Sequence, residues 1–501
     1  MAQSYILSID QGTTGTTVSL INTKGQLKVK VNKEFRQIFP KPGWVEHDPK
    51  DIWRSTSQCI KVALTKARVS GKQIVSIGIT NQRETVMAWD KETGETIGNA
   101  IVWQCRRTTE ICEKLKRKGV EKTLTKITGL VLDPYFSGTK IHWMLTKNSE
   151  VKKRASRGKL CFGTVDSFLI WKLSGGKSHK TDVTNASRTQ LMDLSSLSYS
   201  KDMMKLFGIH VDMLPEINAS GGSFGETVRV AGLPSGIPIT GVLGDQQSAL
   251  FGQFCFNAGE AKITFGTGSF LLMNTDKKKI QSSSGLLSTV AWQLPNSKQA
   301  VYALEGGAFI CGAAVQWLRD YMKFIKKSED VEKLAAKVKD SGGVEFVPSF
   351  SGLGAPFWDP RVKGTIFGLT RGSGPEHIAR ATLEAMALQN VDVVSAMVKD
   401  SKVNLKSVKV DGGAANNKTL MQMQSDFLGV DVVRPKVLET TSYGAALMAG
   451  LGAGVWSSQN DLKKLQKIDL KFKPKLTKKD RLMRHKKWHS AIDAMQTYYN
   501  S

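Results

Sequence analysis

The sequence predicts an α/β protein with two comparable halves, and three observations lead to this fold class. Strands alternate with helical segments from the amino terminus through Leu160–Val165, which is typical of sheets covered by helices. The length of 501 residues exceeds one ordinary domain. The opening pattern, a strand, an Asp-Gln pair and a nearby glycine-threonine turn, returns close to residue 240. We therefore expect two domains, residues 1–245 and 246–501, around a ligand-binding cleft.

The first elements form a predicted hairpin followed by a helix and another strand. Residues 4–9 are an apolar strand, QGTTG is a tight turn, and Thr16–Leu20 is the returning strand. The Asp-Pro pair at 48–49 is a helix-start signal, and apolar residues recur at helical spacing through residues 52–67. The strand QIVSIGIT follows directly.

The second half begins with a similar series. An apolar strand over Ile237–Leu243 leads into GDQQSALFGQ, and Lys262–Asn274 is predicted as strand, Gly-Thr-Gly turn and strand. A further apolar strand in VKVDGGAANN, Val408–Asn417, ends in glycines before a predicted helix. Two short matches between the halves fit chance as well as duplication.

Charge and cysteine content bear on partners and location. The net charge of +27 could favour nucleic acid, but the lysines are spread along the chain, and the clusters at 152–159 and 277–279 lack interleaved aromatic residues for base stacking. We expect a solvated basic surface and no specific nucleic-acid partner. Six cysteines without a C-x-x-C pair indicate reduced thiols, and no leader or membrane-spanning run is recognisable, so a cytoplasmic location is predicted.

Three glycine-containing turns could bind phosphate. GTTG at 12–15, FGTGS at 265–269 and DGG at 411–413 expose backbone N–H groups, and threonine hydroxyls add donors. Neither of the glycine-threonine turns has the Lys-Ser/Thr ending of a P-loop, which disfavours a Walker-type NTPase. Each of these two turns alone is more typical of a plain hairpin, but the three turns together favour nucleotide binding.

Asp10 and Asp245 each follow a predicted strand and precede small polar residues. A single aspartate at such a place usually caps a turn, whereas a pair facing one cleft could hold Mg²⁺, directly or through water. Phosphoryl transfer requires in-line positioning, charge neutralisation and a carboxylate that orients the acceptor hydroxyl. Asp245 suits the last role, mainly by aligning the hydroxyl and accepting its proton late, because an ordinary aspartate with a pKa of about 3.9 is a weak base.

A polyol pocket is also predicted. NQRET places Arg83 and Glu84 just beyond a strand, and Trp103, Tyr135 and Phe136 could supply an apolar wall. A local surface ion pair is the alternative explanation for Arg83 and Glu84. Their position at the carboxyl end of a strand favours ligand binding.

These residues occur in strings that resemble the FGGY carbohydrate kinase family, and in particular its members that act on glycerol. The resemblance extends along nearly the whole chain through DQGTTG, GITNQRET, NAIVWQCRRT, FGTVDSFLIWKL, TDVTNASRT, GDQQSALFGQ, FGTGSF, YALEGGAFICGAAVQWLRD and SGLGAPFWDP. Two family signatures are present, YFSGTKIHWM at 135–144 and GTIFGLTRGSGPEHIARATLE at 364–384. NQRET and WQCRRT distinguish members specific for glycerol from those acting on pentoses.

The resemblance implies two actin-like, ribonuclease-H-like domains on either side of an ATP and substrate cleft. It implies transfer of the γ-phosphoryl group of ATP to glycerol, which gives sn-glycerol 3-phosphate in the first step of glycerol catabolism. The first domain would supply most glycerol contacts and the first phosphate turn, and the second most of the nucleotide site.

The resemblance also implies a role for individual residues. Asp245 would be the catalytic base, and Mg²⁺ would be held by Asp10 and Asp245. The glycerol-binding residues would be Arg83, Glu84, Trp103, Tyr135, Asp245, Gln246 and Phe270. The ATP-binding residues would be Thr13, Thr14, Gly15, Gly266, Thr267, Gly312, Gln316, Gly413 and Asn416.

Three positions depart from the pattern of the family. Thr17 replaces a usual arginine that approaches the nucleotide phosphates, and DGGAANN is one residue shorter than usual. Gly236 stands where members inhibited by fructose 1,6-bisphosphate carry an arginine, so we expect that inhibition to be weak or absent. Two other functions stay open: a kinase for another small polyol or ketose, and a non-catalytic actin-like ATP-binding module. The oligomeric state, dimer or tetramer included, also stays open.

Overall fold

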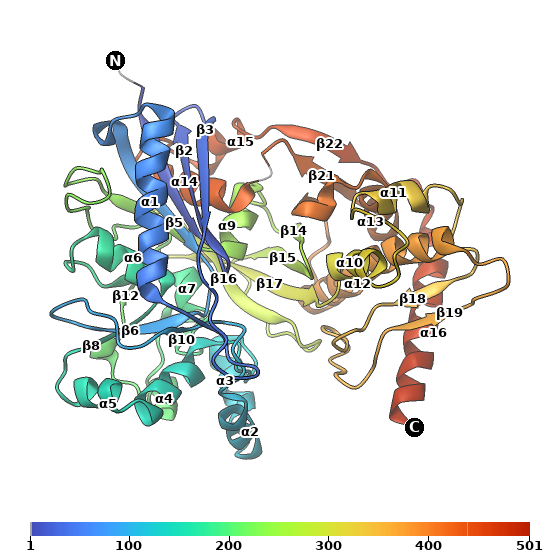
Figure 1. Cartoon of the computed structure of the whole chain (residues 1–501), viewed down its shortest axis with the longest axis horizontal. Coiled ribbons are helices and arrows are strands. Elements are labelled where there is room, and N and C mark those ends of the chain that lie inside the picture. Colours follow the sequence, from blue (N-terminus) through green and yellow to red (C-terminus); the bar gives the residue numbers. More distant parts are fainter. Residues whose placement is uncertain (1–2, 438) are drawn as a thin grey trace.

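The computed structural model describes residues 3–437 and 439–501, which form two large mixed sheets with helices on their faces (Figure 1). The first sheet has the order β13-β5-β1-β2-β3, in which β1, β2 and β3 are antiparallel and β5 and β13 run parallel to β1. Its strands are β1 Tyr5–Gln11, β2 Gly15–Asn22, β3 Leu27–Glu34, β5 Ile74–Asn81 and β13 Ile239–Gly244.

The second sheet has the order β16-β17-β15-β14-β20-β21-β22. Within it β14, β15 and β17 are antiparallel, and β20 and β21 run parallel to β14. Both sheets therefore contain three antiparallel strands followed by two parallel strands in the same spatial order, which favours duplication over chance. The strands are β14 Glu260–Phe265, β15 Ser269–Asp276, β16 Leu287–Gln293, β17 Ala300–Ala308, β20 Ser407–Asp411, β21 Asp431–Pro435 and β22 Ile468–Phe472.

Shorter strands form small sheets beside the large ones. The first half contains β4 Glu46–His47, β6 Val86–Asp90, β7 Ala100–Ile101, β8 Leu160–Thr164, β9 Lys180–Asp182, β10 Met192–Asp193, β11 Ser198–Tyr199 and β12 Glu216–Asn218. The second half contains β18 Glu345–Val347 and β19 Thr365–Phe367.

The helices cover the sheets and supply much of the buried core. They are α1 Pro49–Ala67, α2 Thr109–Arg117, α3 Glu121–Thr128, α4 Ser137–Lys147, α5 Ser149–Ser156, α6 Val165–Leu173, α7 Val183–Ala186, α8 Lys201–Phe207 and α9 Asp245–Gly252 in the first half and at its end. They continue with α10 Gly312–Asp320, α11 Asp330–Ala335, α12 Pro375–Ser401, α13 Lys418–Leu428, α14 Thr440–Gly452, α15 Gln459–Lys463 and α16 Lys478–Asn500. Among the described residues, no helix combines the length and apolar character needed to cross a membrane.

Local sequence signals explain the predicted helix at 49–67. Asp48 caps α1 because its Oδ1 accepts a hydrogen bond of 2.8 Å from the backbone N–H of Lys50, and Pro49 fits the first helical position. The apolar residues at helical spacing, including Ile52 and Ile60, are buried in the core of the first half. The helix and its limits are confirmed.

Helix α14 lies on the first sheet although its sequence belongs to the second half. Its buried residues join those of β1, β13 and α9 in one apolar cluster. The approach is so close that a Cβ atom on Gly78 of β5 would lie 2.3 Å from the Ala445 carbonyl oxygen, and one on Gly444 would lie 1.9 Å from that of Ser248. Glycine at these positions is required by helix packing rather than by a turn.

Candidate active site

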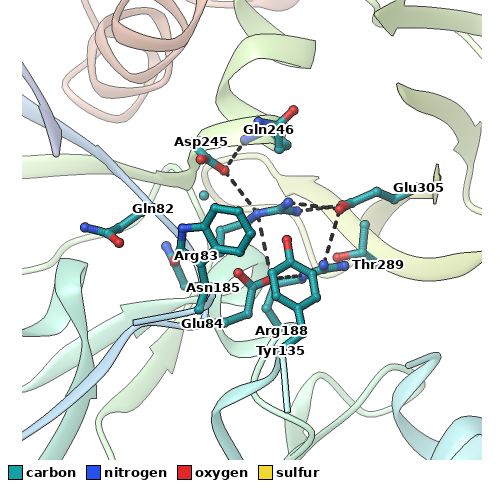
Figure 2. A network of polar contacts seen from close by, with 12 residues as sticks. Gln82, Arg83, Glu84, Tyr135, Asn185, Arg188, Asp245, Gln246, Thr289 and Glu305 are labelled. Atoms are coloured by element: carbon teal, nitrogen blue, oxygen red, sulfur yellow. Dashed lines mark hydrogen bonds and ion pairs between the residues drawn. The ribbon is translucent and has the colours of Figure 1, made fainter. Parts of the chain in front are cut away.

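Arg83, Glu84 and Asp245 meet where two parallel strands of the first sheet end. Arg83 and Glu84 follow β5, and Asp245 is the first residue of α9, directly after β13. Because β5 and β13 are neighbours, their carboxyl ends lie at the same edge. Figure 2 shows these side chains pointing toward one another, with Glu305 of β17 reaching them from the second sheet.

Glu84 occupies a strained backbone conformation. Its φ of 60° lies in the left-handed region, which costs a residue with a side chain about 1–3 kcal/mol. A hydrogen bond of 3.0 Å from the Ser137 hydroxyl to the Glu84 carbonyl oxygen supports this turn. Such strain is concentrated at functional sites, which strengthens the prediction that this turn binds a ligand.

Arg83 is buried and contacts acids from both halves of the chain. Its Nη1 and Nη2 donate to the two carboxylate oxygens of Glu305 at 2.6 and 2.9 Å, and its Nε lies 3.1 Å from Oδ1 of Asp245. Nη1 also donates to Gln247 at 3.2 Å. The alternative that Arg83 belongs to an exposed surface pair is wrong, because its side chain is 2% exposed.

Arg188 completes a buried cluster of two arginines and two glutamates. Its Nε donates to Glu84 at 2.6 Å and its Nη2 to Glu305 at 3.2 Å. Burial opposes ionisation of Glu305, but the positive charges of Arg188 and Arg83 outweigh it and lower its pKa to about 2. Burial likewise opposes the charge of Arg83, but Glu305 and Glu84 hold its pKa above the usual value. Glu305 and Arg83 are therefore charged and held in place, whereas burial raises the pKa of Glu84.

Arg188 and Glu305 are site residues that the sequence analysis did not select. Both lie in strings that carry the family resemblance, TNASRT and YALEGG. The available signal was a charged residue among small and apolar neighbours, because such a charge in a buried element needs a partner.

Asp245 is the acid of this site that remains open to solvent, with 30% of its side chain exposed. Its Oδ1 also accepts the backbone N–H of Gln246 at 2.7 Å. Lys262, a buried residue of β14, donates to Gln246 Oε1 and, at 2.8 Å, to the Thr264 hydroxyl. Burial lowers the pKa of Lys262. Asp245 thus offers a carboxylate of fixed orientation to a ligand.

Aromatic residues lie beside the ionic cluster. The rings of Trp103 and Tyr135 pack edge to face with centroids 5.5 Å apart, and the Arg188 guanidinium lies 5.6 Å from the Tyr135 ring centroid. Phe270, in β15, is half-buried next to Gly307. Trp103, Tyr135 and Phe270 are all half-buried, as the walls of a ligand pocket should be.

The six nucleotide-binding residues predicted in the second half line one pocket of about 320 Å³ between α10, α12 and α13. The backbone N–H of Gly312 donates to the Gly266 carbonyl at 3.0 Å, which ties the start of α10 to the turn between β14 and β15. Gly413 faces open space, since a Cβ atom there would have no neighbour within 4 Å. Leu383 and Met386 of α12 add an apolar wall suited to a flat base. The lining residues that were predicted are Gly266, Thr267, Gly312, Gln316, Gly413 and Asn416.

The predicted phosphate turn of the first half joins β1 and β2. The backbone N–H of Gly12 donates to the Gly15 carbonyl at 2.9 Å, and Thr14 is exposed at the tip. The indole N–H of Trp103 donates to the Thr13 hydroxyl at 2.9 Å. This contact connects the turn to the aromatic wall.

Asp10 lies inside β1, one residue before its end, rather than after the strand. Burial, together with the charges of Asp245 and Glu439, raises its pKa to about 7. Thr17 is its cross-strand partner in β2, so the position where an arginine is usual is directly opposite this carboxylate. Asp10 is half-buried, and a half-buried carboxylate beside a second acid supplies the oxygen donors that Mg²⁺ prefers, so these two residues fit such an ion.

Comparison with known proteins identifies the family. Models of the FGGY family of carbohydrate kinases match the chain over residues 5–252 for the N-terminal domain and 261–453 for the C-terminal domain. The chain belongs to the FGGY family of carbohydrate kinases. The predicted resemblance is confirmed.

Curated relatives of this FGGY kinase cover nearly its whole length. A protein named Glycerol kinase from Bdellovibrio bacteriovorus is 56% identical over 490 residues, which are 98% of this chain and 99% of the relative. A Glycerol kinase from Myxococcus xanthus is 52% identical with the same coverage.

Solved structures confirm the predicted fold. The structure of Plasmodium falciparum glycerol kinase with ADP superimposes with a TM-score of 0.94 at 37% identity, covering 98% of both chains. A ligand-bound xylulose kinase from Lactobacillus acidophilus gives a TM-score of 0.89 at 22% identity, covering 99% of both chains, and shows the shared fold alone.

Proposed function

We propose that this FGGY kinase transfers the γ-phosphoryl group of ATP to glycerol and forms sn-glycerol 3-phosphate. Two comparisons support the proposal: the curated relatives at 52–56% identity carry the name Glycerol kinase, and a related structure of the same name contains ADP. The function predicted from the sequence motifs agrees with these names.

The observation that carries the mechanism is the solvent-accessible carboxylate of Asp245, whose Oδ1 lies 3.1 Å from Nε of the buried Arg83. A terminal hydroxyl of glycerol would donate a hydrogen bond to Asp245, which aligns the oxygen for attack and accepts its proton as the new P–O bond forms. The other hydroxyls would meet the polar groups of Arg83, Glu84, Tyr135 and Gln246, while Trp103 and Phe270 would contact the carbon chain. Glu84 and Tyr135 contribute an acceptor and a donor at fixed positions.

The nucleotide would bind along the remaining predicted residues. The pocket of Gly266, Thr267, Gly312, Gln316, Gly413 and Asn416 is supported as the base and phosphate site by its volume and glycine content. Thr13, Thr14 and Gly15 would present donors to the terminal phosphates. Asp10 and Asp245 would hold Mg²⁺, whose charge neutralises the phosphate oxygens.

The decisive test is ADP formation that depends on glycerol. Wild type should turn over, and Asp245→Asn should lose activity by about a hundredfold or more, because the amide cannot accept the hydroxyl proton. The control is Asp212→Asn, which changes an aspartate that is 75% exposed and paired with His210. Retained activity in Asp245→Asn, with an unchanged melting temperature, would exclude Asp245 as the base.

A substrate panel separates this function from its rivals. A kinase for a larger polyol or a ketose would prefer erythritol, ribitol or xylulose over glycerol. In such an enzyme Phe270→Ala should change the KM for glycerol little. A non-catalytic ATP-binding module would bind nucleotide without glycerol-dependent ADP release.

Other expectations from the sequence stay predictions. These are the boundary between residues 245 and 246, the cytoplasmic location and the oligomeric state. The chain segments matched by the two family models, which end at residue 252 and begin at 261, lie close to that boundary.

A further inference from the structure

A histidine-aspartate cluster lies on two helices of the second half, outside the site described above. Asp392 belongs to α12, and His485 and His489 belong to α16. The Nε2 atoms of both imidazoles lie 2.7 Å from the same carboxylate oxygen, Oδ1 of Asp392. Each residue offers one possible metal-ligand atom, and these three atoms all lie within 4.8 Å of one another.

The helix geometry explains why the three groups converge. His485 and His489 are four residues apart, so their side chains leave the same face of α16 on successive turns. Their rings lie close together, with centroids 4.4 Å apart. Asp392 faces them from α12 and is 2% exposed, whereas the imidazoles are 26% and 43% exposed. The carboxylate is buried, but the histidines leave an opening to solvent.

A second contact orients the carboxylate toward the histidines. The indole N–H of the buried Trp488 donates to Oδ2 of Asp392 at 2.7 Å. This bond leaves Oδ1 for the imidazoles. Metal-binding carboxylates are usually held by such an outer hydrogen bond, which fixes the direction of the free oxygen.

We propose that Asp392, His485 and His489 form a Zn²⁺ site that links α16 to α12. Two imidazole nitrogens and one carboxylate oxygen are a donor set that zinc prefers and that Mg²⁺ does not. Water would fill the fourth position on the exposed side. Zinc would bind the Nε2 lone pair of each imidazole, so a neutral imidazole would carry its single proton on Nδ1 and a protonated imidazole would release its Nε2 proton to solvent.

The change of geometry required is small. Zinc binds nitrogen and oxygen ligands at about 2.0–2.2 Å, which sets neighbouring ligand atoms of a tetrahedron about 3.3 Å apart. The two distances from Oδ1 of Asp392 to the Nε2 atoms of His485 and His489, now 2.7 Å, would need to widen by roughly half an ångström. The ligand atoms of the two imidazoles lie within 4.8 Å of each other, and rotation of the partly exposed imidazoles would bring them to the spacing that zinc requires.

The site would reinforce a helix that is already anchored by other contacts. Trp488, Ile492 and Met495 are buried against the second half, and Arg484 pairs with Glu384 at 2.8 Å. Helix α16 therefore folds without metal, and zinc adds to its stability in proportion to the occupancy of the site. The metal is independent of catalysis, because the cluster shares no residue with the proposed active site.

Equilibrium dialysis of the full-length protein tests the proposal. The chain is freed of metal with EDTA and then dialysed against ZnCl₂ in a large excess of Mg²⁺, and bound zinc is measured by elemental analysis. Wild type should retain one tightly bound zinc per chain. His485→Gln and His489→Gln should each weaken binding by about tenfold or more. His210→Gln removes an exposed histidine that also pairs with an aspartate, and should bind zinc like wild type.

Melting temperatures in EDTA and in zinc provide the second measurement. Zinc should raise the melting temperature of wild type and His210→Gln but not that of the His485→Gln, His489→Gln double variant. Equal melting temperatures in EDTA, and equal glycerol-dependent ADP formation, show that the double variant is folded. The proposal is overturned if wild type retains no tightly bound zinc, or if the double variant binds it as tightly.

Discussion

Replacing Glu305 with glutamine should destabilise the protein strongly, because it removes a buried charge on which two arginines depend. The carboxylate is 3% exposed and accepts three hydrogen bonds, two from Arg83 and one from Arg188. Lowering its pKa from 4.5 to about 2 corresponds to about 3 kcal/mol, since one pKa unit is worth about 1.4 kcal/mol. Breaking a buried ion pair from one side typically costs about 3–5 kcal/mol, so the two figures agree.

Urea denaturation at neutral pH measures this effect. The folded pKa of Glu305 lies below the ordinary value, so the stabilisation is present above pH 4.5 and is lost as the pH falls toward 2. The control, Glu216→Gln, removes an acid that is 66% exposed and 3.8 Å from Lys180, and it should change the free energy of unfolding by less than about 1 kcal/mol. If Glu305→Gln also costs less than about 1 kcal/mol, the charge of Glu305 does not stabilise the fold through the two arginines.

Three more predictions follow from glycines and a buried histidine. Gly413→Ala should raise the KM for ATP without changing the melting temperature, because a Cβ atom there has no neighbour within 4 Å. Gly444→Ala should lower the melting temperature, because its Cβ atom would lie 1.9 Å from the Ser248 carbonyl oxygen. If the two variants had the same melting temperature, this prediction would be wrong. Burial lowers the pKa of His47 to about 4, so folding stability should fall as the pH drops from 6.5 to 4, and His47→Gln should reduce that fall in thermal melts. Fructose 1,6-bisphosphate should inhibit ADP formation little or not at all, because Gly236 stands where the inhibited members of the family carry an arginine. Marked inhibition would refute this prediction.

Local elements of the fold could be predicted because their signals are short-range. The hairpin over residues 4–20, the helix at 49–67 and the paired strands at 262–274 depend on turn glycines, a capping pair and apolar periodicity, and the structure confirms all three. The prediction that Asp10 follows its strand is wrong, because Asp10 and Gln11 still pair with β2 on one side and β5 on the other, so β1 continues to Gln11.

Long-range contacts could not be predicted in the same way. Glu305 is separated from Arg83 by 222 residues, and no local pattern specifies which buried acid neutralises which arginine. The position of α14 on the first sheet likewise cannot be read from local sequence, because the apolar character of a segment does not specify which surface buries it. Family motifs indicated where these residues lie in the chain, while their partners came from the structure.

The contacts of Arg83 change the role that the sequence suggested for it. An arginine has five N–H donors. Two on Nη1 are used by Glu305 and Gln247, one on Nη2 is used by Glu305, and Nε faces Asp245. Among the described residues, one N–H of Nη2 makes no hydrogen bond. We therefore propose that Arg83 acts chiefly as a positioning residue for Asp245 and contributes at most that single donor to glycerol binding.

Arg83→Lys distinguishes these two roles. Lysine keeps the positive charge, so Glu305 retains a partner, but a single ammonium group cannot contact Glu305 and Asp245 in the same fixed geometry. We expect kcat to fall by about tenfold or more together with a rise in the KM for glycerol, since a misplaced base slows the chemical step itself. Arg54→Lys, at a side chain that is 64% exposed, is the matched control. A raised KM with an unchanged kcat would instead make Arg83 a glycerol ligand alone, because loss of binding that is equal in the ground and transition states leaves kcat as it was.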